Sequence, residues 1–136
     1  MNALKWAGAP VTLKKHHKRL SDLCKVQDGF GSSIQCISLA LSHIKKTYFS
    51  FRYSDRLTLK SLDAHLKGGG SVIVVHPNEI GLHVSLIINQ TETGFLAVNA
   101  IAGKTIAEIP RNQVRLWVRS GANAAWFIAK IGTANK

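Results

Sequence analysis

The chain has 136 residues, of which 46% are hydrophobic and 18% charged; this composition excludes a disordered chain and predicts one domain with a sizeable core. The formal net charge of +11 predicts attraction to an anionic partner such as nucleic acid, an anionic membrane surface or an acidic protein. No apolar run approaches the ~18 residues of a membrane span, and residues 1–13 hold no signal-peptide core. Cys24 and Cys36 are too few for a disulfide framework. They could pair, but a reduced intracellular chain is the simpler expectation.

The N-terminal part predicts two helices after an irregular lead over residues 1–12. Leucines recur on one helical stripe around residues 14–25, and this helix carries the densest basic run of the sequence, Lys14, Lys15, Lys18 and Arg19. The run is either a solvated helix face or a surface that docks an anionic partner. A glycine-containing loop over residues 27–33 then leads into a mostly apolar helix over residues 34–47, which we expect to be central to the core.

The C-terminal part predicts a further helix and a run of short strands. Residues 48–53 are rich in aromatics and are either extended or a loop; residues 58–67 have leucines at helical spacing, and three glycines end that helix. Pro110 opens a short helix or turn that reaches Val118, and residues 132–136 form a tail. The expected strands are Ser71–His76, Gly81–Ile88, Gly94–Asn99, Lys104–Ile109 and Ala124–Ile131. This order predicts an α+β domain spanning residues 1–136, with N-terminal helices packed on a mostly antiparallel sheet of four or five strands.

The hairpin formed by residues 81–88 and 94–99 contains two polar residues that could face each other, His83 and Asn99. If it folds about Thr91, His83 faces Asn99, and directly opposed residues point to the same side of a sheet. An asparagine facing a histidine can hold one imidazole nitrogen and fix the tautomer. The alternative is a surface histidine and a turn-side asparagine that never meet, and a slip of one residue in register would separate them.

Cys36 is the best candidate for a nucleophile, because the predicted helix places it in the first turn, where the helix dipole lowers a thiol pKa. The alternative is a buried, inert cysteine. His76 is a second candidate base, ranked below His83 because it precedes Pro77 at a strand end. The cysteines and histidines lack the paired spacings of a zinc site, and the sequence has no Gly-x-Ser-x-Gly elbow. We expect neither a metal nor another cofactor.

The order Cys36, His83, Asn99 on a helix followed by a sheet resembles that of small papain-like cysteine peptidases. Bacteriocin-processing peptidase domains are similar in a glycine followed by an apolar strand, as at residues 70–75, and in a tryptophan segment, as at residues 116–118. Compact papain-like effector proteases of bacteria resemble the chain at residues 35–41 and 99–103. The resemblance covers about residues 27–120. It implies a Cys36–His83–Asn99 triad.

The sequence departs from the pattern of that family at the oxyanion position. The family usually has a glutamine six residues before the nucleophile, where this chain has Phe30, and Gln27 lies six residues before Ser33 instead. In that second register Ser33 takes the nucleophile position and the domain is a degenerate relative. No glycine follows Cys36, as it would in the processing peptidases. Gln35 and Gln27 are both candidates for an oxyanion donor beside the Cys36 backbone N–H.

Three functions follow from these observations. The first is a cysteine hydrolase acting on a peptide or protein, either as a processing enzyme or as a bacterial toxin or effector domain with a cognate inhibitor; we expect it in the cytoplasm or delivered into a target cell. The second is a papain-like module without catalysis that binds a peptide, membrane or nucleic acid through its basic surface. The third is a basic nucleic-acid-binding domain that uses the aromatic residues 48–53 to stack bases.

Overall fold

The structure is a computed structural model that describes residues 36–44, 49–78, 81–101, 103–120 and 124–130. The chain divides into two compact units, residues 1–51 with 130–136 and residues 52–129. The predicted helix over residues 14–25 and the predicted loop over residues 27–33 lie outside the described residues. A single domain over the whole chain therefore stays a prediction.

The described part of the first unit contains helix α3, Cys36–Ile44. This helix confirms the core of the predicted segment 34–47, whose two ends lie outside the described residues. Leu41 is buried and Ser42 is exposed, as expected for a helix with one face turned to a core. Cys36 is the first described residue of α3 and is half-buried, and its place in the first helical turn stays a prediction because residues 34 and 35 lie outside the described residues.

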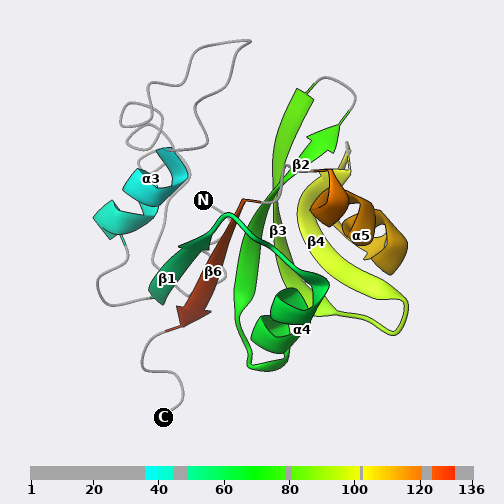
Figure 1. The fold of residues 1–136 in the computed structure, drawn as a ribbon, viewed down its shortest axis with the longest axis horizontal. Coiled ribbons are helices and arrows are strands. Elements are labelled where there is room, and N and C mark those ends of the chain that lie inside the picture. Colours follow the sequence, from blue (N-terminus) through cyan, green and yellow to red (C-terminus); the bar gives the residue numbers. More distant parts are fainter. Residues whose placement is uncertain (1–35, 45–48, 79–80, 102, 121–123, 131–136) are drawn as a thin grey trace. The chain divides into compact units, whose positions relative to one another are not determined.

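Six strands form one sheet in the order β1-β6-β2-β3-β4-β5 (Figure 1). Every pairing from β6 across to β5 is antiparallel. The strands are β1 (Phe49–Ser54), β2 (Ser71–Asn78), β3 (Gly81–Gln90), β4 (Gly94–Ile101), β5 (Lys104–Pro110) and β6 (Ala125–Lys130). The expected α+β pattern with a mostly antiparallel sheet is confirmed, but the expected number of strands is too small. The aromatic segment that we leave open between strand and loop is β1.

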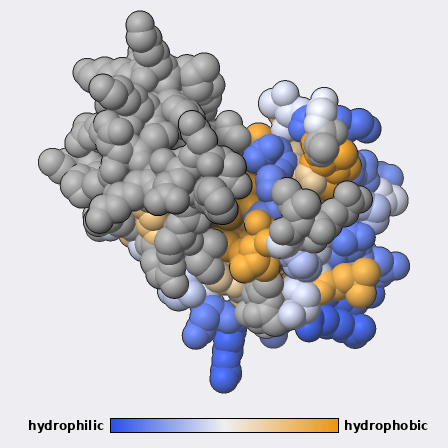
Figure 2. Space-filling model, turned by 90° about the horizontal axis from the view of Figure 1, so that it is seen from above, coloured by the Kyte–Doolittle hydropathy of each residue, from blue (hydrophilic) through white to orange (hydrophobic). Residues whose placement is uncertain are grey.

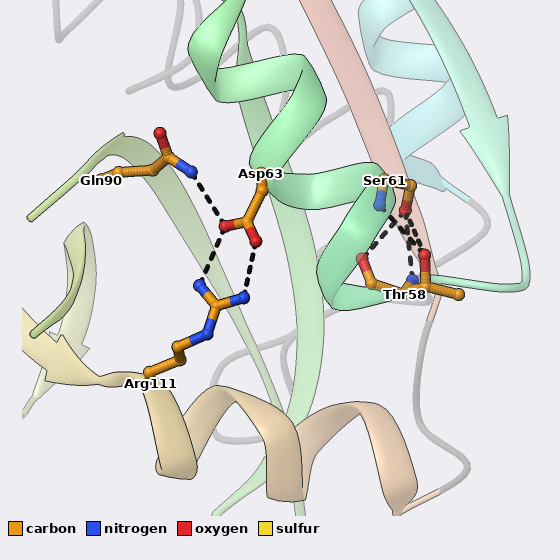
Figure 3. A network of polar contacts seen from close by, with 5 residues as sticks. All are labelled: Thr58, Ser61, Asp63, Gln90 and Arg111. Carbon is orange, nitrogen blue, oxygen red and sulfur yellow. Dashed lines mark hydrogen bonds and ion pairs between the residues drawn. The ribbon is translucent and has the colours of Figure 1, made fainter.

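Helix α4, Leu59–Lys67, begins where the sequence predicts because Thr58 and Ser61 form a reciprocal cap. The Thr58 hydroxyl accepts from the Ser61 N–H at 3.0 Å, and the Ser61 hydroxyl accepts from the Thr58 N–H at 3.2 Å (Figure 3). Gly68 ends the helix, which confirms the predicted glycine stop. Helix α5, Arg111–Arg119, follows Pro110, so of the two predicted possibilities the helix is correct.

Helices α4 and α5 cover the same face of the sheet (Figure 1). Leu62 and Leu66 of α4 and Val114 and Trp117 of α5 are buried against it. Alternate strand residues supply the other side of this core, since side chains two apart share a face. They are Val72, Val74, Ile87, Phe95, Ala97, Ile109, Ala125 and Phe127.

A polar bridge joins the two helices to the sheet. The Arg111 guanidinium donates to both carboxylate oxygens of Asp63, at 3.1 and 2.6 Å, and the Gln90 amide donates to the same carboxylate at 2.9 Å (Figure 3). The hydrogen bonds from Arg111 hold the pKa of Asp63 below its ordinary value. Asp63 lies on α4, Gln90 ends β3 and Arg111 begins α5, so the bridge fixes where both helices meet the end of the central hairpin.

The central hairpin does not have the register that a fold about Thr91 predicts. Leu86 pairs with Val98 and Gln90 pairs with Phe95, with an irregularity between Ile87 and Asn89. The Thr91 N–H donates to the Gly94 carbonyl at 2.9 Å, and the Gly94 N–H donates to the Thr91 hydroxyl at 2.9 Å. The turn is therefore centred later in the chain than predicted, and a β-bulge in β3 shifts the pairing again.

Candidate functional site

His83 and Asn99 meet, but through the Asn99 backbone and not through its side chain. The His83 Nε2 lies 2.6 Å from the Asn99 carbonyl oxygen. Asn99 has a φ of 61°, in the left-handed region, and it lies in the part of β4 where the pairing with β5 shifts between Val98 and Ile101. Asparagine tolerates this conformation better than most residues. This irregularity of β4, which we call the Asn99 bulge, turns the Asn99 carbonyl toward the imidazole, while Asn99 itself is exposed.

The hydrogen bond to the Asn99 carbonyl shows which nitrogen of the His83 ring carries the hydrogen. A carbonyl oxygen only accepts, so Nε2 carries the hydrogen, and in the neutral ring Nδ1 holds a lone pair. Among the described residues, none hydrogen-bonds to Nδ1. His83 is half-buried, so its ring combines a fixed tautomer with access to an incoming group.

A second histidine lies beside it, on the neighbouring strand. His76 pairs with His83 across β2 and β3, and the two rings meet edge to face with centroids 5.4 Å apart. His76 is 3% exposed and its ring stacks on Trp117, with centroids 3.8 Å apart and an interplanar angle of 10°. Burial lowers the pKa of His76, the hydrogen bond to the Pro77 carbonyl raises it, and the charge of His83 lowers it. His76 is therefore enclosed and its pKa lies below the ordinary value.

Ser85 connects the two histidines to the bulge. Its hydroxyl lies 2.7 Å from His76 Nε2 and 3.2 Å from the Asn99 carbonyl oxygen, and the residue is 2% exposed. We did not identify Ser85 from the sequence. The signal is its position two residues after His83, because the period of a strand puts both side chains on one face. A serine at an otherwise apolar, buried strand position requires hydrogen-bond partners.

Cys36 is disulfide-bonded, which contradicts the expectation of a reduced chain. The only other cysteine in the sequence is Cys24, which lies outside the described residues. The two cysteines are only 12 positions apart in the sequence. Closing so short a loop costs little chain entropy, so a single disulfide is feasible without further cysteines. A sulfur in a disulfide is not a nucleophile, since the thiolate is the reactive form.

The other residues predicted for the site do not enter this geometry. The oxyanion candidates Gln27 and Gln35, the alternative nucleophile Ser33 and the basic run lie outside the described residues. Cys36 belongs to the first unit and His83 to the second, so the structure brings together His83 and Asn99 but assigns no distance from either to Cys36. Among the residues described, no group of three or more histidine, cysteine, aspartate or glutamate side chains could hold a metal ion.

Comparisons with known proteins find similar chains by structure and not by sequence. No family model matches the sequence, and no curated protein matches it significantly. The peptidase domain of Streptococcus ComA, a bifunctional ABC transporter involved in a quorum-sensing pathway, is similar with a TM-score of 0.67 and 13% identity. The match covers 93% of this chain and 83% of that one. The likeness therefore extends over nearly the whole chain.

Two further solved structures agree with this result. A putative C39-like peptidase from Bacillus anthracis matches with a TM-score of 0.60 and 14% identity, over 92% of this chain and 83% of that one. The peptidase domain of Streptococcus mutans ComA matches with a TM-score of 0.59 and 13% identity, over 84% of this chain and 89% of that one. The resemblance to papain-like peptidases that the sequence suggests is thus confirmed at the level of the fold. This chain has the papain-like peptidase fold of C39-like peptidase domains.

Proposed function

We propose that this chain is a papain-like cysteine hydrolase that cleaves peptide or other amide bonds. Cys36 is the nucleophile, His83 moves the proton, and Asn99 orients His83 through its backbone carbonyl. The peptidase fold supports the class of reaction. The observation that carries the proposal is the hydrogen bond from His83 Nε2 to the Asn99 carbonyl, because it leaves Nδ1 as a base with a defined direction.

The reaction needs only groups that the sequence contains. His83 Nδ1 takes the proton of the Cys36 thiol, and the thiolate attacks the carbonyl carbon of the substrate. The His83 imidazolium then protonates the leaving amine as the C–N bond breaks, which leaves a thioester on Cys36. Water, deprotonated by His83, hydrolyses the thioester. The Cys36 N–H and a glutamine, Gln27 or Gln35, stabilise the oxyanion of each tetrahedral intermediate.

The disulfide at Cys36 makes this activity conditional on reduction. Breaking the bond takes two electrons from an external thiol or phosphine and returns Cys36 as a free thiol. Activity therefore requires a reducing compartment or a reducing partner, in agreement with action in the cytoplasm. A toxin or effector delivered into a target cell, with a cognate inhibitor in the producing cell, is one setting that meets this condition.

The test is cleavage of an unfolded, fluorescently labelled protein such as casein, with and without a reductant. We expect cleavage by the reduced wild-type protein, none by the oxidised protein or Cys36→Ala, and a loss of at least ~100-fold in His83→Ala. Ser33→Ala is the control, and its activity stays at the wild-type level. Cleavage that survives Cys36→Ala but not Ser33→Ala would move the nucleophile to Ser33 and reject this assignment.

A papain-like module without catalysis is the second candidate, and the disulfide at Cys36 favours it. It would bind its anionic partner through Lys14, Lys15, Lys18 and Arg19. This function predicts binding that weakens with salt, weakens on replacing those four residues with glutamine, and is unchanged in Cys36→Ala. Stacking of nucleic-acid bases on the aromatic segment is less well supported, because Phe49 is fully buried. Tyr53 is exposed, but its ring already packs against Trp126.

A further inference from the structure

His76, Ser85 and Trp117 form a buried polar cluster that the proposed reaction does not use. His76 and Ser85 are almost completely buried, on neighbouring strands β2 and β3, and Trp117 of α5 covers the His76 ring. Burying an imidazole and a hydroxyl costs free energy unless both are hydrogen-bonded. His76 bonds to Ser85, and Ser85 bonds to the Asn99 carbonyl, the same oxygen that holds His83.

The protons of the cluster can be assigned from its acceptors. The His76 Nδ1 lies 3.1 Å from the Pro77 carbonyl, so Nδ1 carries a hydrogen and Nε2 of the neutral ring is an acceptor. The single hydroxyl proton of Ser85 then has two acceptors, His76 Nε2 at 2.7 Å and the Asn99 carbonyl at 3.2 Å. While His76 is neutral, the Ser85 hydroxyl donates to His76 Nε2, which is the closer acceptor. The Asn99 carbonyl then accepts only from His83.

Protonation of His76 reverses this arrangement. Nε2 becomes a donor to the Ser85 oxygen, and the hydroxyl proton of Ser85 must turn to its other acceptor, the Asn99 carbonyl. There it competes with the Nε2–H of His83, which lies 2.6 Å from the same oxygen. Among the described residues, the titratable group that acts on His76 is His83 of β3, whereas α5 presents the uncharged ring of Trp117.

We propose that His76 and Ser85 are positioning residues for His83, and that Ser85 passes the protonation state of His76 to the carbonyl that holds His83. The proposal rests on the proposed function for its catalytic meaning, since it makes His83 the base. At neutral pH the pair leaves the His83 hydrogen bond intact. When His76 is protonated, the Ser85 hydroxyl weakens that bond, so the orientation of the His83 ring depends on a residue outside the proposed reaction.

The experiment is a pH titration of the imidazole nitrogens by ¹⁵N NMR, which reports the tautomer of each ring without requiring activity. In the wild-type protein we expect His83 in the Nε2–H form at neutral pH, with an inflection in its titration curve where His76 titrates. In His76→Phe, which keeps a ring against Trp117, the inflection disappears, and the Nδ1–H form of His83 gains population because Ser85 is left with the Asn99 carbonyl alone.

Ser85→Ala separates the hydroxyl route from direct repulsion between the two rings. We expect the inflection of His83 to shrink by at least half in Ser85→Ala, and to stay unchanged in Ser71→Ala. Ser71 is the matched control because it is a fully buried serine of β2 whose hydroxyl has no hydrogen-bond partner among the described residues. An inflection of equal size in Ser85→Ala and wild type would overturn the proposal.

Activity measurements keep the two proposals apart. If casein is cleaved in a Cys36-dependent way, the acid limb of kcat moves in Ser85→Ala and stays in place in Ser71→Ala. If casein is not cleaved but the NMR coupling behaves as expected, the proposed function fails while the His76–Ser85 connection stands. If casein is cleaved and the His83 inflection is the same in Ser85→Ala and wild type, the proposed hydrolase function is supported and the positioning role is rejected.

Discussion

Asn99 shows how one residue can serve a site through its backbone. Its left-handed φ of 61° turns the carbonyl toward His83, and its side chain is exposed. The sequence predicts that His83 and Asn99 meet, and in the structure they do so through the Asn99 carbonyl and not through its side chain. It cannot predict that the contact is made by the carbonyl, because that depends on a bulge which alternation of polar and apolar residues does not reveal.

Replacement of Asn99 distinguishes a backbone role from a side-chain role. Asn99→Gly keeps the left-handed conformation and the carbonyl, so we expect His83 to stay in the Nε2–H form and activity to remain within a few-fold of wild type. Asn99→Val strains the backbone by about 1–2 kcal/mol, and both the tautomer and the activity should be lost. Chemical denaturation and ¹⁵N NMR measure these effects. Equal losses in the two variants would assign the role to the amide side chain.

The buried His76 makes the stability of the protein depend on pH. Its pKa is lowered from 6.5, mainly by burial, so the unfolded chain binds more protons than the folded one between that lowered pKa and pH 6.5. Stability therefore falls as the pH decreases through this window and rises again toward neutrality. In His76→Phe the drop in Tm between pH 7 and pH 5 should be smaller than in wild type. A wild-type drop in His76→Phe would show that another group is responsible.

At the scale of elements, prediction from sequence succeeds where the signal is local. The Thr58 cap and the glycines after Lys67 define both ends of α4, and Pro110 precedes α5. The strand β1 is the exception: its residues alternate between aromatic and polar, as in a strand, but the segment is short and we leave it open between strand and loop. The hairpin register is wrong for a different reason, since the hydrogen bonds of Thr91 and the bulge in β3 follow from tertiary geometry.

Gly94 is a position where an element leaves no room for a side chain. A Cβ on Gly94 would lie 2.1 Å from the Ile109 carbonyl oxygen of the paired strand β5. Gly94→Ala must therefore push β4 away from β5, and we expect a loss of about 1–3 kcal/mol in the free energy of unfolding. Gly68→Ala is the control, because its Cβ meets only ordinary contacts at 3.6 Å. Urea denaturation compares the two, and a Gly94→Ala protein as stable as Gly68→Ala would contradict this packing.

The whole molecule combines a peptidase fold with a strong positive charge, and the two features do not depend on each other. A net charge of +11 accelerates encounter with an acidic partner or substrate but does not define the chemistry. The described helices include none long and apolar enough to cross a membrane. Figure 2 shows apolar areas among hydrophilic ones on the coloured part of one face. Among the described residues, the exposed large apolar ones are Tyr53, Leu82, Ile101, Ile106 and Leu116.

The sequence predicts the class of this fold, and solved peptidase domains share that fold at only 13–14% identity. The sequence leaves the pairing of the two cysteines open, and it does not reveal the cluster of His76 and Ser85. Both depend on which side chains the folded chain brings together, and single residues separated in sequence carry no signal of that.

The most direct test of the hydrolase proposal is the pH dependence of Cys36 alkylation by iodoacetamide in reduced protein. Peptide mass spectrometry separates Cys36 from Cys24, and wild type is compared with His83→Ala and with the control His65→Ala. His65 also bonds a backbone carbonyl through Nε2, that of Ile128 at 2.8 Å, but has no part in the proposed reaction. We expect Cys36 to react well below the reference thiol pKa of about 8.5 in wild type and His65→Ala, and only near it in His83→Ala. Identical profiles in all three proteins, or a Cys36 that stays inert after reduction, would contradict a thiolate–imidazolium pair and leave the binding module as the function.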